Sequence, residues 1–329
     1  MSTAAAQGPV PRDARVYVAG HRGLVGSAVL RRLRAAGFGD VVTRDRAELD
    51  LRDPHAVEAF FAAERPAYVV LAAAKVGGIL ANDRYPVDFL HDNLLIATHV
   101  IHAALRHDVV KLLNLGSSCI YPRLAPQPIP EDALLTGPLE PTNRAYAIAK
   151  IAAIELCDAI RRQHGRSFIS AMPTNLYGPG DDFDLETSHV LPALLRKVLE
   201  ATESGAPTVT VWGSGTPRRE FLYVDDLADA CLFLLDHVDR PGPINVGTGS
   251  DVTIRELAVT IAEVVGFCGV LVFDASRPDG TPRKLLDVAP LQRLGWRAAT
   301  PLREGIERTV AWYRAQRGAP AAAGGGDPR

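Results

Sequence analysis

Hydrophobic positions follow two different periods along the first 172 residues of the chain. Short apolar runs of strand length alternate with longer segments in which apolar residues recur at helical spacing. The expected strands are 15–19, 40–42, 68–71, 111–115 and 168–172, and the expected helices are 27–36, 54–64, 93–106 and 145–163. Buried strands that alternate with amphipathic helices are typical of β-α-β units. We therefore predict an α/β fold built on a doubly wound parallel sheet with helices on both faces.

Beyond residue 180 this alternation loosens into charged loops and more widely spaced elements. We expect a helix over 189–202, a further segment at 209–215, a helix that ends near 237 and a strand at 244–247. No linker marks a clean boundary. We therefore expect a main domain over 15–180, with segments near 209–250 returning to it. Residues 181–318 would form most of a smaller, discontinuous C-terminal lobe, with substrate bound between the two. Residues 1–14 and 319–329, rich in Ala and in Pro or Gly, are expected to be a disordered leader and tail.

Charge and composition narrow the class of protein. The 329 residues carry 36 Lys and Arg against 38 Asp and Glu, interspersed along the chain, which argues against a nucleic-acid partner. The longest uncharged apolar run, 67–74, has the length of a core strand, and residues 1–13 lack the apolar centre of a signal peptide. We expect a cytoplasmic protein with no membrane partner. The cysteines lack the paired spacing of a zinc site or a disulfide framework, so we expect neither; they are Cys119, Cys157, Cys231 and Cys268.

A glycine-rich turn joins the first expected strand to the first expected helix. In this G-x-x-G-x-x-G spacing, Gly20 permits a tight turn and Gly23 lets the backbone approach a pyrophosphate. Gly26 allows the helix to pack closely against the strand, with its N-terminus facing the phosphates. The order strand, glycine turn, helix predicts a dinucleotide site of the Rossmann type. The alternative is a tight turn with only a structural role.

The residues after the second expected strand bear on which dinucleotide is bound. Asp45 would accept a hydrogen bond from the ribose 2′-hydroxyl of NAD, whereas Arg44 and Arg46 suit the 2′-phosphate of NADP. Arg22 in the glycine turn is a possible third cation. We favour NADP(H), because the arginines outnumber the single carboxylate. The alternative is that Arg44 and Arg46 lie in a solvated turn.

Tyr146 and Lys150 lie one turn apart on the helix expected from residue 145 onward. A nearby ammonium favours a phenolate, so we expect Lys150 to lower the pKa of Tyr146 toward neutrality. Ser117, at the carboxyl end of an expected strand, would hold a substrate oxygen against the phenol. These three residues are the groups that hydride chemistry between a carbonyl and an alcohol requires. The spacing alone also fits a half-buried tyrosine and a solvated lysine.

Together these segments resemble the extended short-chain dehydrogenase/reductase superfamily, over about residues 15–312. Within it, the chain closely resembles enzymes that epimerise C3 and C5, and reduce C4, of GDP-4-keto-6-deoxy-D-mannose. The segments that carry the resemblance are 20–27, 72–79, 116–122, 140–143, 172–179, 212–221 and 278–284. The resemblance implies an NADPH-dependent oxidoreductase with epimerase activity on a GDP-sugar. It also implies a homodimer, because the superfamily commonly dimerises through a helix pair.

The resemblance also implies roles for individual residues. Ser117, Tyr146 and Lys150 would form the hydride-transfer trio, with Cys119 and His189 as the base and the acid of epimerisation. Cofactor contacts are implied for Gly20, His21, Arg22, Gly23, Leu24, Val25, Gly26, Arg44, Arg46, Leu115, Gly116, Ser118, Lys150, Pro173, Thr174, Asn175, Leu176 and His189. Substrate contacts are implied for Lys197, Trp212, Arg219 and Asp279.

The implied chemistry has a physical basis of its own. A ketone at C4 acidifies the protons on C3 and C5, so a base and an acid on either side of the ring can invert both centres through enolates. Donors at the C4 oxygen, Ser117 and Tyr146, would stabilise these enolates. One alternative is another epimerase or reductase of nucleotide sugars. A second is a non-catalytic NADP-sensing protein, which the intact trio disfavours because a sensor needs no acid/base phenol.

Overall fold

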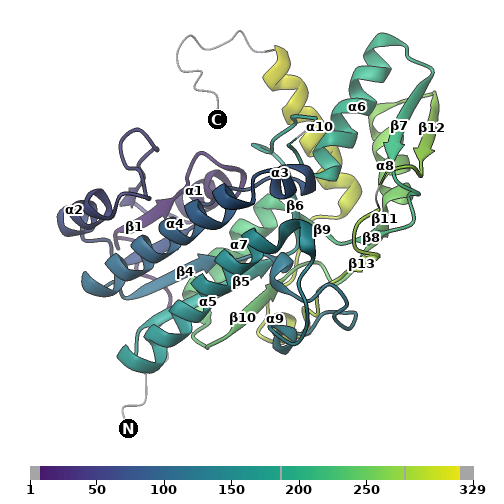
Figure 1. Ribbon diagram of the computed structural model, residues 1–329. Helices are drawn as coiled ribbons and strands as arrows, with labels where there is room; N and C mark the ends of the chain where they lie inside the picture. Colours follow the sequence, from purple (N-terminus) through teal and green to yellow (C-terminus); the bar gives the residue numbers. More distant parts are fainter. Residues whose placement is uncertain (1–7, 186, 278, 319–329) are drawn as a thin grey trace.

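The computed structural model describes residues 8–185, 187–277 and 279–318, and a six-stranded parallel sheet runs through its larger half (Figure 1). The strand order is β10-β5-β4-β3-β1-β2. The strands are β1 (Val16–Ala19), β2 (Val41–Val42), β3 (Tyr68–Leu71), β4 (Lys111–Leu115), β5 (Ser167–Pro173) and β10 (Pro243–Val246). The order reverses between β1 and β3, and in open α/β sheets ligands bind at such a switch point, beyond the carboxyl ends of the strands.

Helices cover both faces of this sheet, which explains why its strands are apolar at nearly every position. Val16 and Val18 of β1 pack into the core beneath α1 (Leu24–Ala35) and α7 (Val224–His237). Tyr17 of the same strand faces the opposite core. That core is covered by α2 (Pro54–Glu64), α4 (Pro86–Arg106) and α5 (Arg144–His164). The predicted doubly wound sheet is confirmed.

Some element boundaries differ from those expected. Helix α4 begins at Pro86, several residues before the expected start at 93, because a proline at the first helical position suits the fixed backbone angle of that residue. Within the segment 209–250, α7 and β10 lie in the layers of the large sheet. Strand β7 (Thr208–Trp212), by contrast, pairs with β12 (Val270–Asp274) in a separate two-stranded sheet.

The second lobe has its own core, formed by α6, α8 and α10 together with short strands (Figure 1). Its helices are α6 (Val190–Ser204), α8 (Ile254–Val265) and α10 (Leu302–Gly318). A mixed three-stranded sheet, in the order β11-β8-β13, connects this lobe to the site; its strands are β8 (Arg218–Arg219), β11 (Val252–Thr253) and β13 (Arg283–Lys284). The remaining elements are α3 (Ile79–Arg84), β6 (Asn175–Tyr177), β9 (Phe221–Tyr223), α9 (Ala289–Arg293) and the 3-10 turns Ser118–Ile120, Glu131–Ala133 and Pro141–Asn143.

The prediction of a disordered leader over residues 1–14 is wrong for residues 8–14. Val10 is buried, its backbone N–H donates to the Asp236 carboxylate, and Arg12 forms an ion pair of 3.1 Å with the same carboxylate. Residues 8–14 are therefore held against α7, because an apolar side chain and an ion pair both find partners there. Residues 1–7 and the expected tail 319–329 lie outside the described residues. No helix within the described ranges is long and apolar enough to cross a membrane.

Candidate active site

The glycine turn after β1 forms a cradle that larger residues would fill. Gly20 has a φ of +83°, and a Cβ at this position would lie 2.7 Å from the Cα of Ala73. A Cβ on Gly26 would lie 2.1 Å from the Gly20 carbonyl oxygen, whereas one on Gly23 would approach that oxygen only to 3.5 Å. No described side chain caps the N-terminus of α1, so backbone N–H groups remain available for phosphate oxygens. These features fit a dinucleotide pyrophosphate. The expected contact residues His21, Leu24 and Val25 belong to this turn and to the start of α1.

Asp45, the residue expected to favour NAD, is engaged within its own loop. Its carboxylate accepts hydrogen bonds from the backbone N–H groups of Ala47 and Glu48 at 2.9 Å, and it forms an ion pair of 2.8 Å with Arg22. Hydrogen bonds in this turn and the nearby guanidinium lower the pKa of Asp45. The carboxylate therefore stabilises the turn. Arg22 is paired with Asp45, so its cation is partly neutralised.

The two arginines of this segment have different surroundings. Arg44 donates to Glu64 at 2.5 Å and lies over the Phe60 ring, 5.6 Å from the ring centre. Arg46 is exposed and forms no ion pair within the described residues. Of the two cations expected at the 2′-phosphate, Arg46 is thus available, whereas Arg44 would have to leave Glu64. The residues present fit NADP, and Arg46 is available to contact the 2′-phosphate.

The other expected cofactor residues gather beyond the carboxyl ends of β4 and β5. A Cβ at Gly116 would lie 2.4 Å from the Met172 sulfur, so only glycine allows the two strand ends to approach so closely. The side chains of Thr174 and Asn175 both donate to the Glu220 carbonyl oxygen, at 3.3 and 2.7 Å. Leu115, Ser118, Pro173 and Leu176 occupy the same two strand ends.

Tyr146 and Lys150 lie together, but not in the way that their spacing predicted. The Lys150 Nζ lies 5.8 Å from the centre of the Tyr146 ring and donates to the Leu115 carbonyl oxygen at 2.8 Å. Burial raises the pKa of Tyr146, as does the negative charge of Cys119, while the Ser117 hydroxyl acts in the opposite direction. The expected lowering of the Tyr146 pKa by Lys150 is therefore wrong for this arrangement. Burial also lowers the pKa of Lys150 itself to about 8.

Cys119 follows Ser117 in the turn after β4 and is surrounded by cationic groups. Its backbone N–H donates to the Ser117 hydroxyl at 3.3 Å, and its sulfur accepts a hydrogen bond from the Lys284 Nζ at 3.2 Å. Burial by itself would raise the pKa of the Cys119 thiol. Lys284, the Ser117 hydroxyl and Arg219 outweigh that effect, so the net pKa is lowered. A thiol in such surroundings can act as a base or nucleophile near neutral pH.

His189 directly precedes α6, and part of its surface reaches solvent. Desolvation of the imidazole lowers the pKa of His189, and the positive charge of Lys284 lowers it further, while Asp182 acts in the opposite direction. The influence of Lys284 on both Cys119 and His189 places the two residues around the same ammonium. The structure thus brings Ser117, Cys119, Tyr146 and His189 to one edge of the sheet, where the Lys284 ammonium contacts the thiol and lies within electrostatic reach of the imidazole.

The expected substrate residues lie on the second lobe. The Trp212 side chain at the end of β7 is 45% exposed, with the Lys197 Nζ 4.6 Å and the Arg277 Cζ 5.0 Å from its ring centre. Asp279 accepts hydrogen bonds from the backbone and the hydroxyl of Ser214 at 2.7 and 2.8 Å. An exposed indole flanked by two cations offers a stacking surface next to positive charge, which suits a nucleoside diphosphate.

Sequence reasoning missed Lys284 and Arg277 as site residues. Lys284 reaches the catalytic edge through the pairing of β13 with β8, whereas Arg277 follows β12, whose last residue, Asp274, pairs with Trp212 of β7. Two-residue strands carry almost no periodic signal, so the chain itself gives no indication of this contact. Arg219, which we expected at the substrate, is half-buried, and Cys119 and Asp279 both lie within electrostatic reach of it.

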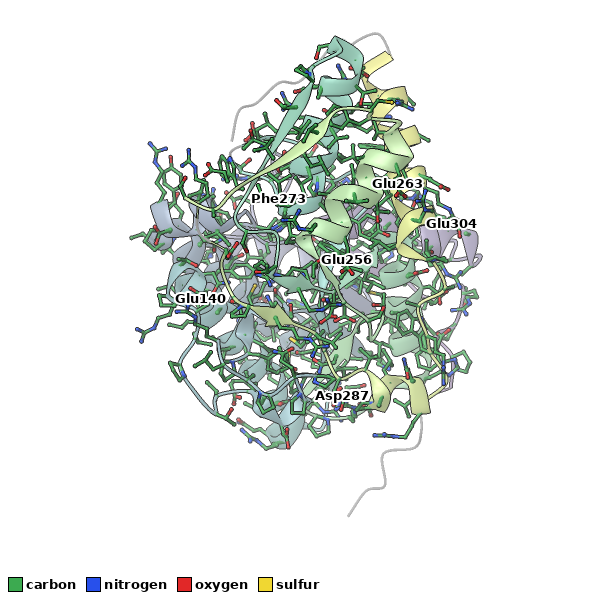
Figure 2. The ribbon with its side chains drawn as sticks, turned by 90° about the vertical axis from the view of Figure 1, so that its right-hand side faces the viewer. Glu140, Glu256, Glu263, Phe273, Asp287 and Glu304 are labelled. Carbon is green, nitrogen blue, oxygen red and sulfur yellow. The ribbon has the colours of Figure 1, made fainter. Side chains whose placement is uncertain are left out.

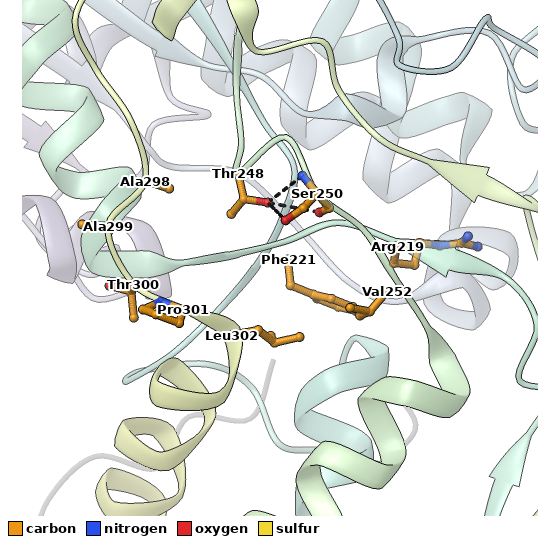
Figure 3. A pocket seen from close by; sticks show the side chains of 10 residues that line it. All are labelled: Arg219, Phe221, Thr248, Ser250, Val252, Ala298, Ala299, Thr300, Pro301 and Leu302. Carbon is orange, nitrogen blue, oxygen red and sulfur yellow. Dashed lines mark hydrogen bonds between the residues drawn. The ribbon is translucent and has the colours of Figure 1, made fainter.

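Arg219 also borders a separate cavity of about 280 Å³ (Figure 3). None of Ser117, Cys119, Tyr146 and His189 lines this cavity. Its lining includes Arg219, Phe221, Thr248, Ser250, Thr300 and Leu302. In the side view, the lobe that bears α8 and α10 rises above the part of the molecule that contains Glu140 and Asp287 (Figure 2).

The fold and this edge of the sheet define a nucleotide-dependent oxidoreductase or epimerase. A family model described as "NAD dependent epimerase/dehydratase family" matches residues 16–247, and the chain belongs to that family. Among curated relatives, "Probable GDP-L-fucose synthase 1" of Oryza sativa subsp. japonica is 62% identical, over 92% of each chain. "GDP-L-fucose synthase" of Escherichia coli (strain K12) is 57% identical, over 91% of this chain and 96% of the relative.

Solved structures show the same likeness. The crystal structure of a GDP-L-fucose synthetase from Naegleria fowleri bound to NADP is similar with a TM-score of 0.88 and 32% identity, covering 95% of this chain and 96% of that one. A GDP-6-OMe-4-keto-L-xylo-heptose reductase from C. jejuni is similar with a TM-score of 0.89 and 35% identity, covering 94% and 100%. Both names describe proteins that act on GDP-linked sugars.

Proposed function

We propose that this protein catalyses the NADPH-dependent 3,5-epimerisation and 4-reduction of GDP-4-keto-6-deoxy-D-mannose, which yields GDP-L-fucose. The observation that carries the proposal is that two chemically different pairs lie at one sheet edge: Ser117 with Tyr146, and Cys119 with His189, both of which the Lys284 ammonium influences. A simple reductase needs only the first pair. The high identity to GDP-L-fucose synthases over nearly the whole length of the chain supports this substrate.

Epimerisation would use the thiol and the imidazole. The Cys119 thiolate takes a proton from the carbon next to the C4 ketone, which leaves an enolate and a neutral thiol. His189 in its protonated form returns a proton to the opposite face. Its lowered pKa makes the imidazolium a stronger acid, although a smaller fraction is protonated at neutral pH. The Ser117 and Tyr146 hydroxyls donate to the enolate oxygen and stabilise it.

Reduction would use the phenol as the proton donor. NADPH, when bound, supplies the hydride that reduces C4. Tyr146 gives its proton to the C4 oxygen, and its raised pKa keeps the phenol protonated over the physiological range. Ser117 holds that oxygen in place. Lys150 fixes the carboxyl end of β4 through the Leu115 carbonyl and carries a positive charge next to the phenol ring.

The test is to incubate the protein with NADPH and matched 4-keto sugars linked to GDP, UDP or dTDP. Loss of absorbance at the reduced nicotinamide band with the GDP-sugar, and a product epimerised at C3 and C5, is the expected result. Oxidation of NADPH without epimerisation would instead identify a 4-reductase. Turnover only with a UDP- or dTDP-sugar would reject the proposed substrate.

We further propose that the protein acts as a homodimer in the cytoplasm. The long helices α4 and α5 lie side by side on one face of the sheet, and a helix pair of this kind offers the self-matching surface that a twofold dimer needs. The four cysteines are free, which suits a reducing compartment in which Cys119 remains a thiol. Sedimentation equilibrium tests the dimer, and fractionation of the native host tests the compartment.

A further inference from the structure

Lys284 is the residue at the site that the proposed chemistry does not yet use. Its Nζ donates to the Cys119 sulfur at 3.2 Å, although the two residues are 165 positions apart in the sequence. A hydrogen bond from an ammonium to a cysteine sulfur favours the thiolate, because a thiolate accepts such a hydrogen bond far more strongly than a neutral thiol does. The contact therefore concerns the charge state of the sulfur and not only its packing.

The backbone around Lys284 is fixed on both sides. Strand β13 pairs in parallel with β8, so that Lys284 lies opposite Arg219. Two residues further on, the Leu286 N–H donates to the carboxylate of Glu220 at 3.0 Å, and Glu220 is completely buried. The Leu285 N–H donates to the Gln127 side chain at 2.9 Å. These bonds hold the start of the lysine side chain in place, so little ordering is needed when the ammonium meets the sulfur.

The charged and titratable groups that face Cys119 come from four elements. Ser117 precedes it in the same turn, Tyr146 comes from α5, Arg219 from β8 and Lys284 from β13. Of the two cations, only Lys284 is within hydrogen-bond distance of the sulfur; Arg219 acts on it only through its electric field. Lys284 also acts on His189, where it disfavours a second positive charge.

We propose that Lys284 is the positioning residue of the epimerisation half-site: its ammonium orients the Cys119 sulfur and stabilises the thiolate that takes the proton from C3 or C5. This inference rests on the proposed function, because it assigns a partner to the thiol that acts as base there. The lysine keeps its own protons throughout, and the thiolate becomes a thiol when it accepts the substrate proton. A cysteine thiol is otherwise mostly protonated at neutral pH, and the contact with Lys284 allows Cys119 to act as a base.

The test measures how readily Cys119 is alkylated by iodoacetamide at different pH values, with the modified peptide quantified by mass spectrometry. Lys284→Met should reduce the alkylation rate of Cys119 at pH 7 about tenfold and shift its pH profile upward, because the thiolate loses its charge partner. Lys284→Arg, which keeps the charge, should restore most of the rate. The exposed Cys268 in the same protein is an internal reference, and its rate should not change.

Arg283→Met is the matched control, because Arg283 is the adjacent cation on β13 but donates to Asp251 instead of Cys119. It should leave the Cys119 profile unchanged. An unchanged profile in Lys284→Met, in a protein that still binds NADPH, would overturn the inference. If Lys284→Met does not fold, Lys284→Gln gives the same comparison. Alkylation needs no sugar substrate, so failure of the GDP-sugar assay would reject the proposed function without altering this result.

Discussion

Two lysines lie beside two of the proposed acid/base groups, Tyr146 and Cys119. The pKa values of these two groups are shifted in opposite directions. Lys150 is one helical turn from Tyr146, yet its ammonium donates to the Leu115 carbonyl, and the pKa of Tyr146 is raised by burial. Lys284 is far from Cys119 in sequence, yet its ammonium contacts the sulfur and helps to lower the pKa of the thiol. The effect of a cation depends on where its hydrogen bonds point, and sequence spacing does not determine that direction.

The opposite shifts suit the two half-reactions that we propose. Reduction needs a phenol that still carries its proton when C4 receives the hydride, whereas epimerisation needs a sulfur that has already lost its proton. Burial without a hydrogen-bonded cation keeps the phenol of Tyr146 protonated. A hydrogen-bonded ammonium favours the thiolate of Cys119. One sheet edge can therefore hold an acid and a base within electrostatic reach of each other.

We expect the largest effect from Tyr146→Phe, which tests whether the phenol is the proton donor of the reduction. It removes the proton donor but keeps the ring that packs 6.4 Å from Phe89, and we expect the rate of reduction to fall by ~10² or more. NADPH binding should be nearly unchanged. Tyr85→Phe, at an exposed tyrosine outside the site, is the control and should be neutral. A Tyr146→Phe enzyme that reduces the substrate at the original rate would assign the proton donor to another group.

Cys119→Ser tests the other half of the comparison. A serine hydroxyl is a much weaker acid than a thiol and cannot supply a comparable base, so exchange of the C3 and C5 protons should fall by about 10². The measurement is deuterium entry at both carbons by NMR, with oxidised NADP bound so that reduction cannot consume the ketone. Cys268→Ser, at an exposed cysteine, should exchange normally. His189→Asn should also slow the exchange. Normal exchange in Cys119→Ser would make Cys119 a packing residue.

We expect Arg46→Ala to affect only the reduction and not the epimerisation. Arg46 forms no ion pair with any described residue and is expected at the 2′-phosphate, so its removal should reduce the preference for NADPH over NADH by about tenfold. Proton exchange at C3 and C5 should be unaffected at saturating NADP. Arg44→Ala should change the preference less, because Arg44 is bound to Glu64. Equal affinity of the unmodified protein for both cofactors would contradict the assignment.

The smallest effect that we expect is a difference in pH dependence. The pKa of Cys119 is lowered, so C3 and C5 exchange should increase several-fold with rising pH and level off below the pKa of an ordinary thiol, about 8.5. The pKa of Tyr146 is raised, so reduction should not decrease between pH 7 and 9 for lack of a protonated phenol. Parallel profiles for the two half-reactions would show that the two residues titrate as one unit.

The regular half of the molecule could be predicted well from its sequence. Strands β3 and β4 and helix α2 have the expected bounds, because continuous apolar runs and a 3.6-residue period report directly on burial. The second lobe was predicted less completely. Helix α8 was missed even though Thr253 and Glu256 form a capping box at its start, a signal that the sequence does carry.

By itself, the sequence determined what is local: the alternation of strands and helices, the glycine turn, and the positions of Tyr146 and Lys150 on one helix face. These features follow from periodicity, backbone freedom and spacing within a single element. Only the tertiary structure decided which charges meet. Arg44 is paired with Glu64, Lys150 donates to a carbonyl, and Lys284 reaches Cys119 because β13 pairs with β8. Electrostatic effects fall steeply with distance and depend on burial, so they are fixed only when distant segments have packed together.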